Sequence, residues 1–443
     1  MAQKVFISFL GSTLYGNCKY AYPTEHFTSS ETRFVQQATL EWINHKDNSF
    51  PDKIFLLLTD GAKGSRLNNW DKNTIERFNP KTKKMEPHEG LEVVLERMNL
   101  INRVNCIAIP DGKDEKEIWD IFDIIFNQLR QLKEDDLFLY LDLTHGFRYL
   151  PMLLLVLGDY AKLFQNVKIA HISYGNFEVR DESDTAPFVD LLPLSKLQDW
   201  KVAANDFISF GNAERLKRIT SDNIRPVLIK TEGSELEKKS KIAAEKLRDL
   251  NNNIYELSLD IKTNRGKKII KGNESAEIKR ILKYLKQDLI KPLNPILEKL
   301  SESVGKFKED DLNNMFAAVE WCIDKQLVQE GITILQEGIV SFLLENSYHN
   351  KDQREYTSGF LSRYGKRFDE SKFSLKYEDR IDLKEKLSGT QNIGRLSDIY
   401  SKIASLRSDI NHAGIGGEPR KASDFEKQLI VLYEETKMNV QQN

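Results

Sequence analysis

The chain has 443 residues, and its 65 Lys and Arg nearly balance 67 Asp and Glu, which excludes a globally basic nucleic-acid binder but not a local basic groove. Three widely separated cysteines, Cys18, Cys106 and Cys322, indicate neither a disulfide framework nor a zinc site, so we expect a reducing compartment. There is no signal pattern and no apolar run of membrane-spanning length, and we therefore expect a cytoplasmic protein of two domains, with three as the alternative.

Apolar runs that alternate with helical patterns predict an α/β domain over residues 1–194. Strands are expected at 4–10, 54–59, 104–109, 137–143 and 167–174, and helices at 31–43, 91–101, 118–129 and from Pro151. A polar loop is expected from Asn17 through Tyr22 to Pro23, and residues 186–194 are expected to return as an edge strand or hairpin. Strands alternating with helices predict a doubly wound, Rossmann-like parallel sheet.

The stretch LFLYLDLTHGFRYLP at residues 137–151 predicts a buried central strand followed at once by a helix. Its unbroken apolar run fits a strand covered on both faces, and Pro151 fits only the first turn of a helix. The corner from Thr144 to Arg148 should point backbone N–H groups and a helix dipole at the carboxyl edge of the sheet, a natural place for an anion. Gly146 would admit a ligand, Thr144 would supply a hydroxyl, and Arg148 a donor fork that matches phosphate. Alternatively, Thr144 caps the helix and Arg148 is a surface side chain.

The first strand is followed by FLGSTLYG at residues 9–16, which lacks the G-x-G-x-x-G spacing of dinucleotide-binding folds. Asp60 follows the second strand, where dinucleotide-binding folds place an acidic residue that binds the ribose. Because the glycine motif is missing, we interpret Asp60 as a turn residue. No P-loop pattern is present. These observations argue against nicotinamide chemistry.

From about Leu194 the strand-like runs disappear, and the rest of the chain predicts helices only. We expect a helical connector over residues 195–225, including a helix that runs to Phe210 and ends at Gly211. A helical domain should follow over residues 226–443.

Two segments of this helical domain stand out before its last helix. The basic patch KTNRGKK at residues 262–268 is interpreted as a solvated loop, with a contact to RNA phosphates as the alternative. Residues 315–346 form a long amphipathic stretch that should build the core, where Gly331 and Gly338 allow close approach of helices.

The final predicted helix lies in RLSDIYSKIASLRSDINHAGIGG at residues 395–417 and contains the chemical candidate. One apolar stripe recurs at helical spacing and consists of Leu396, Ile399, Ile403, Leu406 and Ile410. Arg407 should lie at the flank of the stripe with Asn411 on the same side, and His412 should face solvent, a cleft or a partner subunit. Gly414 and the pair Gly416-Gly417 are expected to end the helix. Arg-x4-His is a pattern that chance also produces, so the interpretation depends on the helix and on Asn411.

Two sets of residues together resemble a known family. DLTHGFRYLP at residues 142–151, with FLGSTLYG at the first strand, is similar to the CARF domain of accessory proteins from type III CRISPR systems. LRSDINHAG at residues 406–414 is similar to the Arg-x4-His motif of HEPN ribonucleases. The order of the motifs also matches, and one departure is Ser408, where many members carry Asn, Asp or His.

The resemblance implies an antiviral, CRISPR-associated protein whose CARF domain binds a cyclic oligoadenylate second messenger and whose HEPN domain cuts single-stranded RNA without a cofactor. The residues implied to contact the messenger are Gly11, Ser12, Thr13, Thr144, His145, Gly146, Phe147 and Arg148. Arg407, Asn411 and His412 are implied to form the nuclease site.

Such a nuclease site needs no metal, because RNA carries its own nucleophile in the 2′-hydroxyl. His412 would be the acid/base, Arg407 the charge clamp and Asn411 an orienting group, and products would carry 2′,3′-cyclic phosphate ends. A single such histidine per chain and a ring of identical nucleotides both favour a homodimer or a higher homo-oligomer. The alternative is a non-enzymatic nucleotide sensor whose helical domain docks a partner or nucleic acid, with His412 on the surface.

Overall fold

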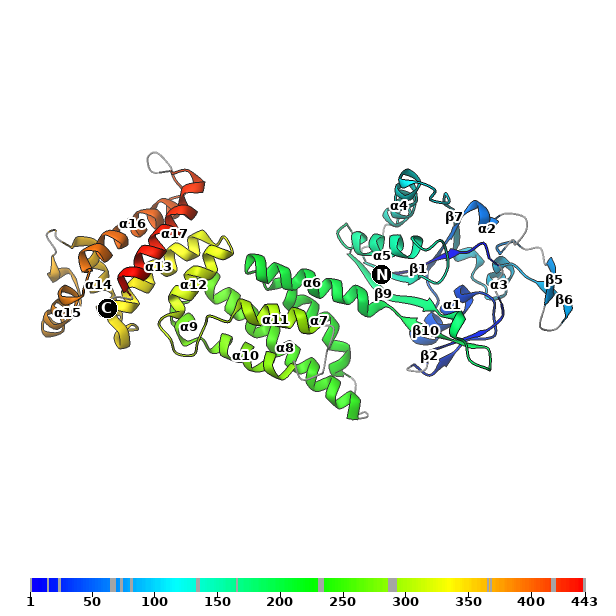
Figure 1. The fold of residues 1–443 in the computed structure, drawn as a ribbon, viewed down its shortest axis with the longest axis horizontal. Helices are drawn as coiled ribbons and strands as arrows, with labels where there is room; N and C mark the ends of the chain where they lie inside the picture. Colours follow the sequence, from blue (N-terminus) through cyan, green and yellow to red (C-terminus); the bar gives the residue numbers. More distant parts are fainter. Residues whose placement is uncertain are drawn as a thin grey trace. The chain divides into compact units, whose positions relative to one another are not determined.

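A computed structural model describes residues 2–13, 16–22, 25–63, 69–71, 75–79, 83–132, 136–164, 166–229, 235–285, 293–364, 366, 369–415 and 420–440. The chain divides into two compact units, Met1–Lys196 and Leu197–Asn443. Figure 1 colours the chain along its sequence and labels the elements of both units.

The first unit is an α/β fold. Its strands are β1 (Gln3–Leu10), β2 (Lys19–Tyr22), β3 (Phe27–Thr28), β4 (Lys53–Leu58), β5 (Ile75–Asn79), β6 (Lys84–His88), β7 (Val104–Ala108), β8 (Asp136–Asp142), β9 (Asn166–Gly175) and β10 (Thr185–Asp190). Its helices are α1 (Val35–Asp47), α2 (Asp60–Lys63), α3 (Leu91–Arg97), α4 (Glu115–Arg130) and α5 (Leu150–Ala161), with 3-10 turns η2 (Ile101–Arg103) and η3 (Phe177–Val179). The unit boundary falls inside α6 (Leu192–Phe210).

The large sheet has the strand order β3-β2-β10-β9-β8-β1-β4-β7. Its five neighbouring strands from β9 to β7 are parallel, whereas β10 runs antiparallel to β9. β1 lies inside this parallel part, and Val5 is in register with Leu139 of β8 and with Lys53 of β4. The expected Rossmann-like parallel sheet followed by an all-helical region is thus confirmed.

Helices cover both faces of this sheet, which explains why its central strands are apolar without alternation. On one face, α4 and α5 bury Ile125 and Leu154 against the strands. On the other face, α1 and α3 bury Trp42 and Leu95. Each of these four side chains is fully buried, and burial of such a side chain stabilises a fold by about 2 kcal/mol.

Parts of the first unit differ from the sequence-based expectation. The expected loop from Asn17 through Tyr22 contains β2, which pairs with β10 and β3, while Pro23 lies outside the described residues. Only the beginning of the expected strand or hairpin at 186–194 is a strand, because α6 starts at Leu192. The helix expected over 91–101 ends at Arg97 and is followed by η2. The β5-β6 hairpin has no counterpart in the prediction.

The second unit is helical throughout its described residues. Its helices are α7 (Glu214–Ile229), α8 (Glu235–Lys262), α9 (Gly266–Lys271), α10 (Asn273–Leu285), α11 (Asn294–Ser303), α12 (Asn314–Asp324), α13 (Val328–Leu344), α14 (Lys351–Arg363), α15 (Tyr377–Gly389), α16 (Ile393–Asn411) and α17 (Ala422–Val440). Two 3-10 turns, η5 (Glu345–Ser347) and η6 (Glu370–Lys372), lie beside α13 and before α15. No helix in the described ranges is long and apolar enough to cross a membrane.

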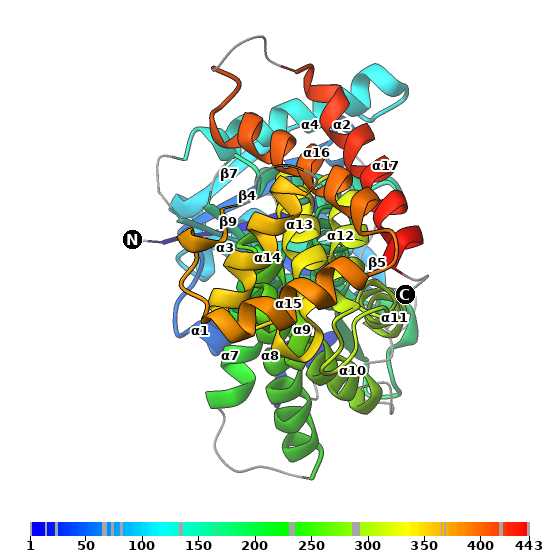
Figure 2. The ribbon, with the colours of Figure 1, turned by 90° about the vertical axis from the view of Figure 1, so that its left-hand side faces the viewer.

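α13 is central to this helical unit, since it packs against α12, α14, α16 and α17 (Figure 2). The expected role of its glycines is confirmed: a Cβ at Gly331 would lie 2.7 Å from Leu429 of α17, and one at Gly338 would lie 3.4 Å from Met315 of α12. The amphipathic stretch 315–346 forms two helices, because the chain turns between Asp324 and Val328.

Gly211 ends α6 as expected. Its φ of +63° is in the left-handed region that favours glycine, and a Cβ there would overlap the Trp321 ring. The basic patch at residues 262–268 is only partly a loop, because its first residue ends α8 and its last three residues begin α9.

Candidate functional site

The carboxyl ends of β1 and β8 form the first candidate site. Because these parallel strands are neighbours, the residues that follow Leu10 and Asp142 meet at one edge of the sheet. They enclose a cavity of about 210 Å³. Its lining includes every messenger-contact residue predicted from the sequence except Arg148, namely Gly11, Ser12, Thr13, Thr144, His145, Gly146 and Phe147.

Arg148 is exposed and lies outside this lining. Thr59, which directly follows β4, also lines the cavity and was not among the predicted residues. The signal that could have found Thr59 is its place after a parallel strand, since β4 is the neighbour of β1.

Gly146 forms the turn that closes the cavity. Its φ is +107°, a value that side chains disfavour, and a Cβ there would lie 3.2 Å from Leu150 and 3.4 Å from Phe9. The helix α5 then begins at Leu150 with Pro151 in its first turn, as the sequence predicted.

A buried carboxylate, Asp142, holds this corner in place by accepting hydrogen bonds from its neighbours. Ser8 donates a hydrogen bond of 2.7 Å to one carboxylate oxygen, and the Thr144 hydroxyl donates one of 2.5 Å to the other. The backbone N–H of Thr144 donates to this second oxygen over 3.1 Å. Burial raises the pKa of the Asp142 carboxyl, while the bonds from Thr144 and Ser8 lower it. Sequence reasoning missed this role, although a carboxylate ending an apolar strand is a usable signal.

These contacts change the interpretation of Thr144. Its hydroxyl proton is directed to Asp142, and its oxygen accepts the backbone N–H of Gly175 over 2.8 Å. In this arrangement Thr144 has no free proton for an anion, and it links the corner to β9 instead. The backbone N–H groups of the corner and the exposed Arg148 remain as donors for an anionic ligand.

Replacing Asp142 with alanine is expected to destabilise the first unit by about 3 kcal/mol, because the hydroxyl and N–H of Thr144 would lose their acceptor and Ser8 would keep only a 3.3 Å contact to the Phe9 carbonyl. Asp142→Asn keeps an oxygen for Thr144 and should cost less than half as much. Urea unfolding of the full chain, followed by circular dichroism, measures both changes. Equal losses in the two variants would contradict the hydrogen-bond role of Asp142.

His145 lines the cavity without carrying a charge at neutral pH. Burial lowers the pKa of its imidazole to about 4. The pKa of His145 in the folded chain lies below the value of about 6.5 in unfolded chains, so the unfolded chain takes up a proton first. The free energy of unfolding is therefore highest above pH 6.5 and falls as the pH is lowered toward 4. Its ring can therefore take part in hydrogen bonding at pH 7, but it adds no positive charge for a phosphate.

The end of α16 forms the second candidate site. The predicted apolar stripe is confirmed, with Leu396, Ile399, Ile403 and Leu406 buried and Ile410 partly buried. His412 follows the last helical residue, and both Asn411 and His412 are exposed. The helix ends because Ala413 and Gly414 have φ values of +55° and +65°, with the Gly414 N–H donating to the Asp409 carbonyl over 3.0 Å. The predicted Gly416-Gly417 pair lies outside the described residues.

Arg407 lies partly buried at the flank of the stripe, as the helical wheel predicted. Its guanidinium donates to Gln336 Oε1 over 3.0 Å and lies 3.5 Å from Glu337 Oε1, both on α13. The other oxygen of Glu337 accepts a hydrogen bond of 2.7 Å from Arg354 on α14. Gln336 and Glu337 were not predicted, although their polar side chains interrupt the apolar sequence of α13.

A second cation, Arg420, stands beside the Arg-x4-His segment. It donates to Asp409 over 3.0 Å and to the Ser405 hydroxyl over 2.8 Å. A cavity of about 390 Å³ adjoins this pair and is lined also by Ala413 and Gly414, which directly follow His412. Within the described ranges, His, Cys, Asp and Glu form no group of three or more that could hold a metal ion.

Comparisons with known proteins place the first site in context. Residues 5–179 match the family model of the CRISPR system endoribonuclease Csx1, CARF domain. Over 338 residues the chain is 26% identical to the CRISPR-associated protein MJ1674 of Methanocaldococcus jannaschii, in an alignment that covers 74% of this chain and 44% of the relative. The chain therefore spans less than half the length of that relative.

Among solved structures, Enterococcus italicus Csm6 bound to cyclic hexa-2′-fluoro-hexa-dAMP is similar with a TM-score of 0.42 and 12% identity, covering 99% of this chain and 94% of that one. The match to the CARF family model includes all the residues that line the first cavity. The helical unit, with Arg407 and His412, lies outside the residues matched.

Proposed function

We propose that this chain is a CRISPR-associated, metal-independent endoribonuclease that cuts single-stranded RNA when a cyclic oligoadenylate binds its first unit. The observation that carries the proposal is the match of residues 5–179 to the CARF domain of an endoribonuclease family. The cavity at the ends of β1 and β8 lies within this match and would contact the messenger. The ring would bind the active conformation of the chain more tightly than the inactive one. This difference in affinity would shift the population toward the conformation in which the second unit cleaves RNA.

The nuclease site would consist of Arg407, Asn411 and His412. An exposed imidazole can remove a proton from a 2′-hydroxyl or deliver one to the leaving 5′-oxygen. Arg407 would stabilise the charge that develops on the phosphorane, and Asn411 would orient the pair. The exposure of His412 on its own protomer supports this role, because substrate and a partner subunit can reach it.

An aromatic face on the first unit, exposed at Trp119, Tyr160 and Phe164, supports a homodimer. It comprises Trp119, Phe122 and Phe126 of α4, Tyr160 of α5, and Phe164 after α5. Successive rings lie between 4.9 and 5.9 Å apart, and Trp119 and Phe164 are 58% and 56% exposed. Exposed apolar patches of this kind mark interaction sites on soluble proteins. A cavity of about 210 Å³ is also small for a ring of nucleotides, so two cavities related by a two-fold axis would accommodate it better.

Substituting glutamate for Val156, one turn before Tyr160 on α5, is expected to convert the dimer to a monomer, because the charge would be buried in the interface without a partner. Val179 offers a matched control on the same unit, since Val156 and Val179 are 60% and 59% exposed. Sedimentation equilibrium of both variants measures the change. Loss of the dimer in Val179→Glu as well, or its retention in Val156→Glu, would contradict the proposed interface.

The deciding experiment incubates the purified chain with labelled single-stranded RNA, EDTA and cyclic oligoadenylates of different ring size. Cleavage that depends on one ring and leaves 2′,3′-cyclic phosphate ends would support the proposal. Tight ring binding without RNA cleavage would instead favour the sensor whose helical unit docks a partner.

A further inference from the structure

The second unit contains a cavity of about 500 Å³ that belongs to neither candidate site. It lies between α12, the last turns of α17 and the loop that precedes α12. Exposed or half-buried lysines surround it (Lys306, Lys308 and Lys437), and aromatic rings lie deeper (Phe316, Phe342 and Tyr433). We call this site the lysine-rimmed cavity. Its volume falls within the range of about 300–1,000 Å³ found for small-molecule sites.

This cavity is distant from the proposed nuclease site. α17 begins at Ala422, which lines the cavity beside His412, and it carries Lys437 in its last turn. Ala422 and Lys437 are 15 positions apart, which corresponds to about 22 Å along a helix. A ligand in the lysine-rimmed cavity would therefore lie apart from the reacting groups.

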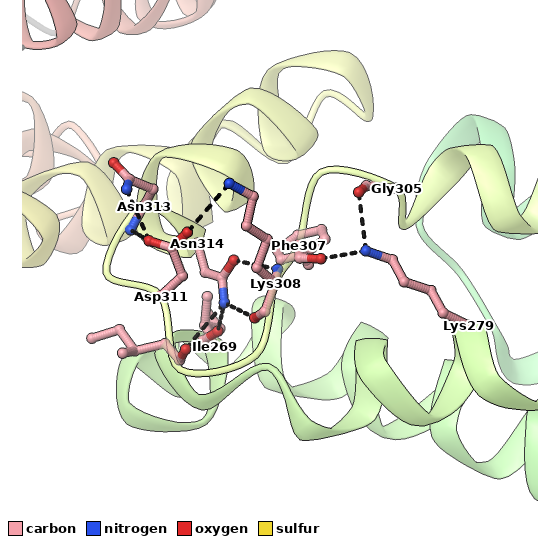
Figure 3. A network of polar contacts seen from close by, with 9 residues as sticks. Ile269, Lys279, Gly305, Phe307, Lys308, Asp311, Asn313 and Asn314 are labelled. Atoms are coloured by element: carbon pink, nitrogen blue, oxygen red, sulfur yellow. Dashed lines mark hydrogen bonds and ion pairs between the residues drawn. The ribbon is translucent and has the colours of Figure 1, made fainter.

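The loop with two of the three lysines is held in place by side chains that bond to its backbone (Figure 3). Asn314, which is 1% exposed, donates to the carbonyls of Ile269, Ile270 and Lys308 and accepts the Lys308 N–H over 2.8 Å. Lys279 donates to the carbonyls of Gly305 and Phe307. These bonds fix the backbone at Lys306 and Lys308 before any ligand arrives, and such preorganisation lowers the cost of binding.

The charges around the lysine-rimmed cavity favour an anion. Lys306 forms an ion pair with Glu320, and Lys308 lies 3.8 Å from Asp311. Lys437 forms no ion pair with any carboxylate in the described part of the chain, and its ammonium lies 5.6 Å from the centre of the Tyr433 ring. The cavity thus holds one cation in excess of its carboxylates, with an aromatic surface beside it.

Aromatic rings supply a surface for a flat, apolar group. Phe316 is 8% exposed and Tyr433 is 4% exposed, whereas Phe342 is only partly buried and stands 6.2 Å from Phe316. Lysines that reach a phosphate, together with rings on which a base can stack, are the combination by which proteins bind nucleotides without reading their sequence.

We propose that the lysine-rimmed cavity binds a nucleotide, with its phosphate at Lys437 and Lys308 and its base against Phe342. The nucleotide is either free in solution or one unit of a single-stranded RNA. This inference does not depend on the proposed RNA cleavage or on messenger binding, because it concerns different residues and is measured by binding alone.

The test uses the full chain and a fluorescein-labelled oligoribonucleotide in which every sugar is 2′-O-methyl, so that attack by a 2′-hydroxyl is impossible. Fluorescence anisotropy at low salt is expected to give a Kd that rises about tenfold in Lys437→Glu and in Lys308→Glu. The slope of log Kd against log salt should change by about 0.7 for each phosphate that no longer pairs with a lysine.

Lys299 provides a matched control. Lys299 and Lys308 are both exposed lysines with an acidic partner three residues later, Glu302 and Asp311. Lys299→Glu should leave the Kd within twofold of the wild-type value, and an equal loss in Lys299→Glu and Lys308→Glu would overturn the proposal. So would unchanged binding in Lys308→Glu and Lys437→Glu.

Phe342 tests the stacking part of the inference. Phe342→Leu should weaken binding severalfold, whereas Phe342→Tyr, which keeps the ring, should not. Equal binding by Phe342→Leu and wild type would overturn the assignment of the base to this ring. AMP and UMP serve as competitors: displacement of the oligonucleotide at millimolar concentration identifies a free nucleotide as the ligand, and its absence identifies an RNA segment.

Discussion

Replacing His412 with alanine is expected to lower the rate of RNA cleavage at least about a thousandfold at saturating cyclic oligoadenylate. General acid-base catalysis contributes about 10² to 10⁴ to such reactions, and in a homodimer the substitution removes the imidazoles of both protomers, the base and the acid. The fold should be unaffected, because His412 is exposed and its backbone N–H bond to Ser408 is kept in the variant. Cleavage of a labelled RNA under single-turnover conditions, with EDTA present, measures the change.

His349 offers a control for this substitution, since it is also an exposed histidine of the second unit. His349→Ala should cleave at the wild-type rate, and messenger affinity should be the same in both variants. Arg407→Ala is expected to match His412→Ala, whereas Arg407→Lys should retain part of the rate because a cation remains. Full cleavage by His412→Ala would exclude this residue from the site.

Replacing Arg148 with alanine is expected to weaken the binding of the cyclic oligoadenylate about a hundredfold. An exposed hydrogen bond to a charged group contributes about 1.5 kcal/mol, and a ring held by two protomers would lose two such bonds, or about a hundredfold in affinity. Because Arg148 is exposed and lies outside the cavity lining, its removal should not change the stability of the first unit. Isothermal titration calorimetry with the messenger measures the affinity.

The rate of RNA cleavage, measured against messenger concentration, distinguishes a loss of messenger binding from a loss of catalysis in Arg148→Ala. Arg148→Ala should need about a hundred times more messenger for half-maximal cleavage, yet it should reach the wild-type rate at saturation. Arg97→Ala is the control, because Arg97 is a surface arginine of the same unit that pairs with Glu89. A lower maximal rate in Arg148→Ala with unchanged affinity would contradict its role in binding the messenger.

The parallel strands and their helices were predictable because each has a local signal, either an apolar run or an apolar stripe at helical spacing. β2 and β3 had none. Lys19–Tyr22 becomes a strand by pairing with β10, which is far away in the sequence, and strand preference of this kind is set by tertiary neighbours. The turn between α12 and α13 also had no local signal, since its residues Lys325, Gln326 and Leu327 include neither glycine nor proline.

The same distinction applies to the candidate sites. Gly146 and the end of α16 could be located from the sequence, because a glycine in a strand-to-helix corner and a glycine after a helix have local causes. The acceptor that Asp142 provides for Ser8 depends on the register of β1 and β8, in which these two residues are paired. No local pattern reports that register, so the bond between Ser8 and Asp142 could not be foreseen, whereas the bonds from Thr144 to Asp142 join residues only two positions apart.

Glu337 connects three helices, since one carboxylate on α13 faces arginines from α14 and α16. The two links differ in strength: Arg354 lies 2.7 Å from Glu337 and also donates to Ser341 and to the Tyr348 carbonyl, whereas Arg407 lies 3.5 Å from Glu337. Arg407 also donates to Gln336 of α13 over 3.0 Å, so two neighbouring side chains of one helix hold its guanidinium. The guanidinium of Arg407, whose shortest bond to α13 is 3.0 Å, is therefore held less closely to that helix than the guanidinium of Arg354, whose shortest bond is 2.7 Å.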